Sequence, residues 1–332
     1  MISADVWKVA DGLTLETNAL LAVRELGKSL ALTAGPGAGK TEVLAQRADF
    51  LLRTGNCRYP KRILAISFKV DASINLKERI RRRCGLDLAA RFDSYTFHGF
   101  AKRIIDRFRP VLTGGDSLEP NYSIGDEPIQ GKQIKFAQLI PLATKILSHS
   151  VVARNAICQT YTDVFLDEFQ DCTTEQYALL KLVFMNKPIR LTAVGDTKQK
   201  IMGWAGALDG IFIDYAKDFD ARPLNLYRNF RSKPRLLRMQ NEIIRTLDPA
   251  AVMADDLIIG NDGELLARNY DNSHSEAAAL ANIIQKWIDV EKIPLPEIAI
   301  LFPRQIDLYG PPSWSNWQPE EFPIATSMSL KI

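Results

Sequence analysis

The sequence predicts an α/β fold built on a parallel sheet, followed by the start of a second α/β lobe. Short β-rich segments alternate with amphipathic helical segments, a pattern typical of parallel sheets covered by helices. The chain has 332 residues, too many for one ordinary domain and enough for two cores. Its 46% hydrophobic and 24% charged residues are typical of a folded globular protein. We therefore expect one lobe over residues 1–233 and an incomplete second lobe over residues 234–332.

The expected strands of the first lobe are short apolar segments at residues 29–33, 63–67, 164–166, 190–194 and 224–226. A helix is expected over residues 41–53, where apolar side chains recur at helical spacing until Gly55 and Asn56 end the pattern. Residues 108–160 contain turn residues and no clear strand before a helical segment near residues 133–147. We interpret this stretch as a mostly helical insertion.

The second alternating pattern begins near residue 234. It consists of a helix to about residue 247, a strand at residues 265–269, a helix at 275–290 and a strand at 297–302. A Pro- and Trp-rich segment follows, and a last strand is expected at residues 322–326.

The composition excludes several classes of protein. Residues 1–8 carry charge where a signal peptide would need an apolar stretch, and no apolar run reaches membrane-spanning length. We therefore expect a cytoplasmic protein with no membrane partner. The 4 cysteines lack metal-binding spacing and the 3 histidines complete no metal pattern, so we expect reduced thiols and no zinc.

Positive charge gathers in two segments, although the net charge is only +3. The first holds Lys77, Arg79, Arg81, Arg82 and Arg83, and the second holds Lys102, Arg103, Arg107 and Arg109. Such clusters are either solvated helix faces or contacts to nucleic-acid phosphates. The sequence leaves both interpretations open.

A phosphate-binding loop is predicted between the first strand and the first long helix. Its residues are Ala34, Gly35, Pro36, Gly37, Ala38, Gly39, Lys40 and Thr41. Small residues let backbone N–H groups close around phosphate oxygens, and the helix N-terminus adds partial positive charge. Lys40 is expected to reach the β- and γ-phosphates and the Thr41 hydroxyl to bind Mg²⁺. We therefore predict an ATP–Mg²⁺ site here.

Two carboxylates follow the predicted strand at residues 164–166. Ligands of parallel sheets bind at the carboxyl ends of strands, which is where Asp167 and Glu168 lie. Asp167 is expected to bind Mg²⁺, and Glu168 to take a proton from the attacking water. The alternative, an acidic turn after a strand, is disfavoured by the phosphate-binding loop in the same chain.

Six motifs in order resemble those of UvrD/Rep-like superfamily 1 DNA helicases. Residues 167–171 match the family's DE[YF]QD motif, and residues 96–100, Thr-Phe-His-Gly-Phe, are similar to TFHSF. Residues 63–68 are similar to the DNA-contacting segment after the phosphate loop, and residues 194–207 to VGDxxQSIYxWRGA. The remaining two are residues 226–232, similar to LxxNYRS, and residues 297–302, similar to a second-lobe strand. The resemblance implies RecA-like lobes.

The resemblance also implies roles for individual residues. Gln199 would couple the γ-phosphate to DNA, Arg231 would neutralise charge on the transferred phosphoryl group, and Phe230 would stack on adenine. Phe68 and Trp204 would stack on unpaired bases. His98 would contact the DNA backbone. The expected partner is single-stranded or partly duplex DNA.

Several positions depart from the family pattern. The adenine-recognising Gln upstream of the loop is not evident, and Asn18 is the nearest amide. Val70 and Asp71 stand where the family has Asn-Lys, Met202 where it has Tyr, and Ala205 where it has Arg. These departures weaken the expected grip on DNA and leave base selectivity open.

The last residues resemble the start of a further family motif. Residues 326–331 are similar to TxHxxKG, with Met328 in the His position, and the motif that normally supplies a second arginine to ATP does not follow. We expect a fragment, an early stop, or a natural short form that works with a partner. Alone, the chain is expected to bind ATP and hydrolyse it slowly.

The function that these motifs predict is ATP-dependent translocation on single-stranded DNA, with 3′ to 5′ unwinding implied by the family. One alternative is an ATP-responsive DNA sensor or regulatory subunit that does not unwind, paired with a nuclease in phage defence. Another is an inactive truncated helicase.

Overall fold

The computed structural model describes residues 1–198, 208, 210–247, 249 and 252–301. Contacts between residues divide the chain into two compact units, Met1–Gly263 and Glu264–Ile332. The first unit holds every strand of the described residues, so the architecture that positions a site lies there.

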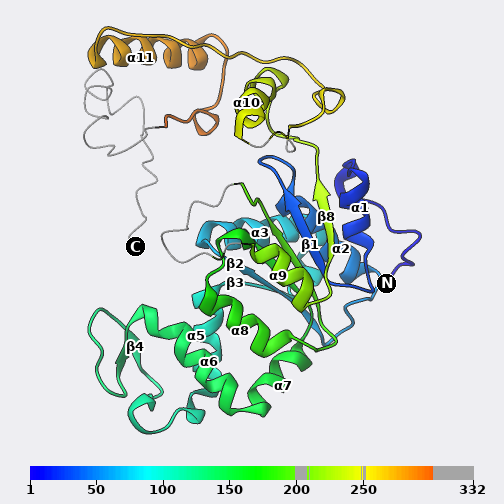
Figure 1. The fold of residues 1–332 in the computed structure, drawn as a ribbon, viewed down its shortest axis with the longest axis vertical. Helices are drawn as coiled ribbons and strands as arrows, with labels where there is room; N and C mark the ends of the chain where they lie inside the picture. The colour runs from blue at the N-terminus through cyan, green and yellow to red at the C-terminus, as the bar shows by residue number, and fades with distance from the viewer. Residues whose placement is uncertain (199–207, 209, 248, 250–251, 302–332) are drawn as a thin grey trace. The chain divides into compact units, whose positions relative to one another are not determined.

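A six-stranded parallel sheet forms the centre of the first unit (Figure 1). Its strands are β1 (Leu30–Ala34), β2 (Arg62–Ser67), β3 (Phe92–Thr96), β6 (Tyr161–Asp167), β7 (Arg190–Gly195) and β8 (Arg222–Leu226), in the order β3-β2-β6-β7-β1-β8. Every neighbouring pair is parallel, which confirms the predicted fold class. The sequence did not predict β3, because this edge strand has Asp93 and Ser94 between its two aromatic residues instead of forming an apolar run.

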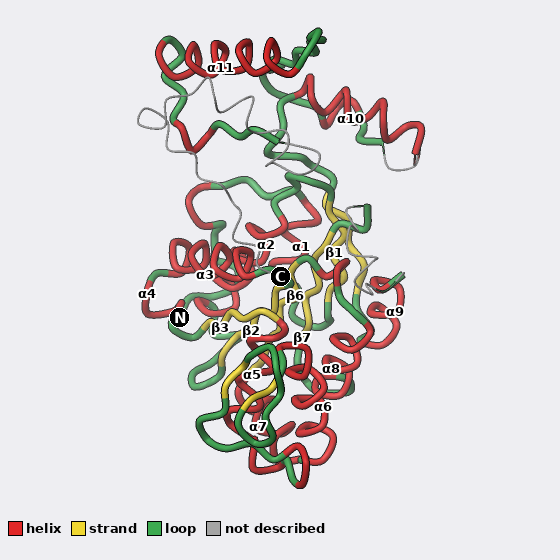
Figure 2. Tube along the Cα trace, turned by 90° about the vertical axis from the view of Figure 1, so that its left-hand side faces the viewer, coloured by secondary structure: helices red, strands yellow, loops and turns green. Residues whose placement is uncertain are grey.

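Helices cover both faces of the sheet (Figure 2). Successive strand residues point to opposite faces, so Leu30 and Leu32 of β1 pack in one core and Ala31 packs in the other. The first core contains α1 (Thr17–Arg24), α2 (Lys40–Arg53), α3 (Val70–Cys84) and α4 (Leu86–Ala89). The second contains α5 (Phe97–Phe108), α6 (Leu139–His149), α7 (Val151–Thr160), α8 (Thr174–Phe184) and α9 (Ile211–Asp218).

The stretch predicted as an insertion contributes two helices to the second core. In α6, the buried Leu139, Ala143 and Ile146 follow helical spacing and lie in this core, where α6 packs against α5 and α8. The residues before α6 are mostly irregular, with two short parallel strands, β4 (Ser123–Ile124) and β5 (Gln133–Ile134). The predicted start of the helix near residue 133 is therefore too early.

The described helices are short compared with a membrane-spanning segment, or too polar. No single helix is both long and apolar enough to cross a membrane. One bent pair, Phe136–His149 with Val151–Thr160, meets the length and composition limits only when its two parts are taken together across a bend of 102°.

The chain after residue 233 departs from the prediction. Helices α10 (Pro234–Leu247) and α11 (Ser273–Asp289) match the two that were expected. The strands expected at 265–269 and 297–302 are absent from the described residues, and Leu295–Glu297 forms a 3₁₀ turn instead. Among the described residues, no strand lies beside these two segments, and their apolar side chains are exposed: Leu301 is 91% and Leu266 67% exposed. The strand expected at 322–326 lies outside the described residues.

Candidate functional site

The predicted loop lies between β1 and α2, the strand–loop–helix arrangement that the sequence indicated. Gly39 has φ 80° and precedes α2, and Gly37 has φ 72°, values that favour glycine. A Cβ on Gly37 would lie 2.5 Å from Oδ1 of Asn229. Ala34, the last residue of β1, is buried beneath the loop. The glycines therefore allow the loop the backbone conformation that phosphate binding needs.

A cavity of about 420 Å³ opens beside this loop. Nine residues predicted for the site line it, and the predicted Ala34 and Asp167 do not; the nine are Gly35, Gly37, Ala38, Gly39, Lys40, Thr41, Glu168, Phe230 and Arg231. The rest of the lining comes from the loop, from residues 13–16, and from Ala19, Glu42, Val43 and Arg79. Residues from opposite ends of the first unit's sequence thus converge on one cavity of the size that binds a small ligand.

The two acidic residues occupy different environments. Asp167 ends β6 and is 4% exposed, and burial, with a smaller contribution from the charge of Glu168, raises its pKa to about 6. Its carboxylate accepts a hydrogen bond from Glu168 N at 3.1 Å. Glu168 has φ 50°, a left-handed conformation rare outside glycine, and its Oε2 lies 3.5 Å from Lys40 Nζ.

Mg²⁺ fits the residues present at this edge. Asp167 is a buried carboxylate without an ion-pair partner among the described residues, which is a costly state that a divalent cation would relieve. A carboxylate and the Thr41 hydroxyl are oxygen ligands of the kind that Mg²⁺ prefers. These two residues are therefore the candidates to hold the ion.

Gln170 links the acidic pair to the next strand, a role that the sequence did not predict. Its side-chain amide donates to Glu168 Oε2 at 2.8 Å, and its Oε1 accepts from Asp196 N at 3.0 Å. A Cβ on Gly195 would lie 2.3 Å from the same Oε1. Gln170 therefore holds Glu168 and the start of the segment at 194–207 in a fixed relation.

The segment after β8 docks directly on the loop. Asn229 donates from Nδ2 to Pro36 O at 2.7 Å and accepts at Oδ1 from the N–H groups of Arg231 and Ser232, at 2.8 and 2.9 Å. Phe230 N donates to Gly37 O at 2.9 Å. These bonds hold the backbone of Arg231 beside the loop, and its side chain lies next to Gly37 at the cavity.

The upstream end of the cavity is anchored by Glu16. Its carboxylate accepts from Tyr227 N at 3.1 Å and Arg228 N at 2.8 Å. The amide of Asn18 donates instead to Asn225 O at 2.7 Å and does not line the cavity. Asn18 thus joins α1 to β8, and the structure does not favour it as a base-recognising residue.

The predicted DNA-contacting residues lie at the same edge of the sheet. Phe68 and His98 follow the ends of β2 and β3, whose last residues, Ser67 and Thr96, are paired. The His98 ring stacks on Phe136 with centroids 4.2 Å apart, and burial lowers its pKa. Gln199 and Trp204 lie outside the described residues.

Two of the five residues in the first basic cluster pair with acidic residues on other elements of the first unit. Glu42, on α2, accepts from Arg79 Nη1 at 2.8 Å and from Arg83 Nε and Nη2 at 2.8 and 2.9 Å. Arg83 also pairs with Asp11. These contacts favour a structural role for the two arginines, which join α3 to the helix that follows the loop.

The sequence matches a known protein family over most of the first unit. The family described as the UvrD/REP helicase N-terminal domain matches residues 15–135 and 129–220, more than half of the chain. The chain belongs to the UvrD/REP helicase family.

Curated relatives of this UvrD/REP chain carry helicase names. It is 26% identical to the ATP-dependent DNA helicase PcrA of Bacillus subtilis, over 85% of this chain and 46% of PcrA. It is 24% identical to the ATP-dependent DNA helicase Rep of Escherichia coli, over 81% of this chain and 49% of Rep. A probable DNA helicase II homolog of Mycoplasma genitalium is 23% identical over 82% of this chain and 50% of its own length. The chain spans about half the length of these relatives.

The UvrD/REP match and the structure cover different parts of the site. The matched residues include the loop, Asp167, Glu168, Phe68 and His98. Phe230 and Arg231 lie beyond residue 220, so their placement at the cavity comes from the structure alone. Asn229 was visible in the motif at 226–232, but its contact with the loop was not.

Proposed function

We propose that this chain is the ATP-binding portion of a single-stranded DNA translocase or helicase, with ATP bound in the 420 Å³ cavity beside Lys40. The observation that carries the proposal is the convergence of Lys40, Glu168 and Arg231 on that cavity. A phosphate cradle, a base and a second cation are the parts that phosphoryl transfer requires. The names of the curated relatives support the same activity.

The residues take distinct roles in this proposal. Lys40 and the backbone of the loop hold the phosphates, and Arg231 offsets charge on the transferred group. Mg²⁺, when held by Thr41 and Asp167, supplies neutralisation of phosphate charge. Glu168 Oε2 is held by Gln170, whereas Oε1 has no hydrogen bond among the described residues and is free to accept the proton of the attacking water.

Coupling to DNA follows from the register of the sheet. Thr96, Ser67 and Asp167 pair in a row across β3, β2 and β6. The expected DNA-contacting residues Phe68 and His98 therefore follow strands adjacent to the catalytic strand. Gln170 connects Glu168 to Asp196, at the start of the segment that carries Gln199 and Trp204. Translocation in the 3′ to 5′ direction is part of the proposal.

The test compares two variants at the loop and the base. Lys40→Ala should abolish tight ATP–Mg²⁺ binding, because the loop loses its side-chain cation. Glu168→Gln, of nearly the same shape, should keep nucleotide affinity and lose turnover by roughly 10²–10⁴, the usual contribution of a general base. Nucleotide binding and phosphate release are measured with and without oligo-dT. Equal losses of affinity in the two variants would contradict the assigned roles.

Strand displacement separates the helicase from the alternative. Unwinding of a partly duplex substrate supports the translocase. ATP binding that responds to DNA without displacement, together with co-purification of a nuclease, supports a regulatory subunit instead.

A further inference from the structure

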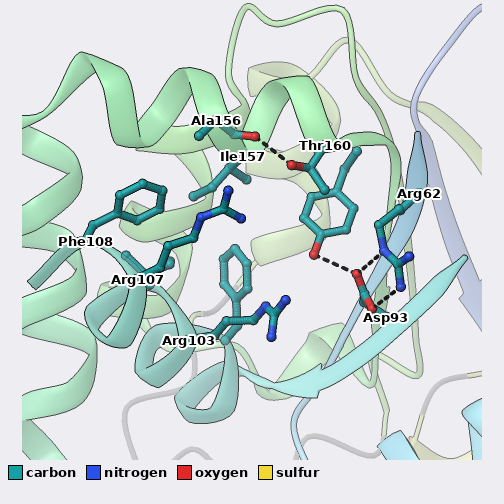
Figure 3. A pocket seen from close by; sticks show the side chains of 11 residues that line it. Arg62, Asp93, Arg103, Arg107, Phe108, Ala156, Ile157 and Thr160 are labelled. Carbon is teal, nitrogen blue, oxygen red and sulfur yellow. Dashed lines mark hydrogen bonds and ion pairs between the residues drawn. The ribbon is translucent and has the colours of Figure 1, made fainter. Parts of the chain in front are cut away.

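A second cavity, of about 370 Å³, is lined by side chains of α5, α7 and the neighbouring strands (Figure 3). It lies at the ends of the strands opposite to those that carry the loop. Its wall includes Arg62, Asp93 and Tyr161, which stand at or near the amino ends of β2, β3 and β6. The expected ATP and DNA residues follow the carboxyl ends of strands. The length of β2, five residue steps at about 3.3 Å each, separates the two edges by about 16 Å.

The acidic group in this wall is already neutralised. Arg62 donates to Asp93 through Nε at 2.7 Å and through Nη2 at 2.6 Å. The Tyr161 hydroxyl donates to the same carboxylate at 2.9 Å, and burial raises the pKa of that hydroxyl. The negative charge of Asp93 is therefore offset by Arg62, and the pair should attract or repel a charged ligand only weakly.

Two arginines extend from α5 into the cavity (Figure 3). Arg103 and Arg107 are exposed, lie one helical turn apart, and have no ion-pair partner among the described residues. Both guanidinium groups lie over aromatic rings: Cζ of Arg103 is 5.6 Å from the ring centroid of Tyr95, and Cζ of Arg107 is 5.5 Å from that of Phe108. Like charges at this spacing destabilise a helix, so an anion between them would be favoured.

The base of the cavity is apolar. Phe100, Ile104 and Ile157 line it and are 2%, 3% and 7% exposed. Phe108 adds an aromatic ring beside Arg107. The cavity thus combines two uncompensated guanidinium groups with an apolar surface, a combination that suits a ligand with a charged end and a planar apolar body.

We propose that this cavity binds a phosphate monoester carried on an aromatic group, at a site separate from the one proposed for ATP. A phosphate dianion matches two positive charges, and guanidinium groups bind phosphate oxygens in paired geometry. The aromatic body would lie against Phe108, whose ring is only partly buried, above the apolar base of the cavity. The inference rests on the α5 cavity alone and does not depend on the proposed ATPase activity.

The experiment measures binding of phenyl phosphate and dAMP by isothermal titration calorimetry. Phenol and deoxyadenosine, which lack the phosphate, are the matched ligands, and inorganic phosphate lacks the aromatic body. The variant is Arg103→Ala/Arg107→Ala. The control is Lys102→Ala/Arg109→Ala, which also removes two positive charges from this region, but at residues that do not line the cavity.

We expect both phosphate esters to bind wild type and the control alike. The Arg103→Ala/Arg107→Ala variant should bind phenyl phosphate at least about tenfold more weakly, equivalent to about 1.4 kcal/mol. Arg103→Lys/Arg107→Lys, which keeps charge without the planar fork, should fall between the two. Any dAMP that binds at the ATP cavity should bind equally well to all of these variants. A difference in affinity between the variants therefore reports on the α5 cavity.

Two results would overturn the proposal. One is equal affinity of wild type and Arg103→Ala/Arg107→Ala for phenyl phosphate, including the absence of binding to either. The other is equal binding of phenyl phosphate and phenol. Both arginines are exposed, so circular dichroism should show an intact fold. If the alanine variant unfolds, the lysine variant gives the same comparison.

Discussion

Replacing Asn229 with Ala tests how Arg231 is placed at the cavity. The substitution removes two hydrogen bonds accepted from the N–H groups of Arg231 and Ser232, one donated to Pro36 O, and a longer one donated to Ser232 Oγ at 3.5 Å. At about 1 kcal/mol for each of the three shorter bonds, the docked arrangement should lose about 3 kcal/mol. That loss corresponds to roughly 150-fold in its population relative to undocked arrangements. ATP turnover should fall by up to the same factor, because Arg231 is then seldom in place.

Asn229→Asp is the matched control. It keeps both accepted bonds but loses the bonds donated to Pro36 O and Ser232 Oγ, and it sets a carboxylate oxygen against Pro36 O, so turnover should fall, though less than in Asn229→Ala. Steady-state phosphate release at saturating ATP measures the effect, and thermal unfolding checks that both variants fold. If Asn229→Ala hydrolyses ATP as fast as wild type, or if the two variants are equally impaired, the docking argument fails.

Three further predictions concern the acidic strand end, the loop and the DNA edge. The pKa of Asp167 is about 6, against 3.8 when unperturbed, so between these values the folded chain binds more protons than the unfolded one, and stability falls as pH rises, by up to about 3 kcal/mol. Asp167→Asn should remove this dependence in denaturant unfolding. Gly37→Ala should weaken nucleotide binding, because its Cβ would lie 2.5 Å from Asn229 Oδ1; an unchanged affinity in fluorescent-nucleotide titration would contradict this. Phe68→Ala should reduce single-stranded DNA affinity by about 1–3 kcal/mol with an unchanged salt slope in anisotropy titrations, because a phenyl ring releases no counterions; an unchanged affinity would contradict the stacking role.

Local pattern predicted the centre of the fold well. Strands β1, β2, β6 and β7 are buried on both faces and are apolar in sequence, so each could be found without its neighbours. The edge strand β3 carries Asp93, which pairs with Arg62 across the sheet, and that partner is invisible in a local window. The strands expected at 265–269 and 297–302 are absent for the converse reason, because an apolar run forms a strand only beside another strand and the described residues after 263 offer none.

The candidate site was predictable where one motif holds its own residues together. Lys40, Thr41, Asp167 and Glu168 could be assigned because loop and strand ends have fixed local geometry. The contacts that join the motifs could not be. Glu16 and Arg228 are 212 residues apart in sequence, and their bond exists only because α1 and β8 lie together in the fold. Glu42 likewise takes up arginines that the sequence offered equally well to DNA.

The docking of residues 227–232 on the loop has a consequence for how the molecule would use a nucleotide. Every described residue that lines the 420 Å³ cavity belongs to the unit Met1–Gly263. Substitutions within this unit should therefore be enough to change the affinity for a nucleotide that the cavity holds.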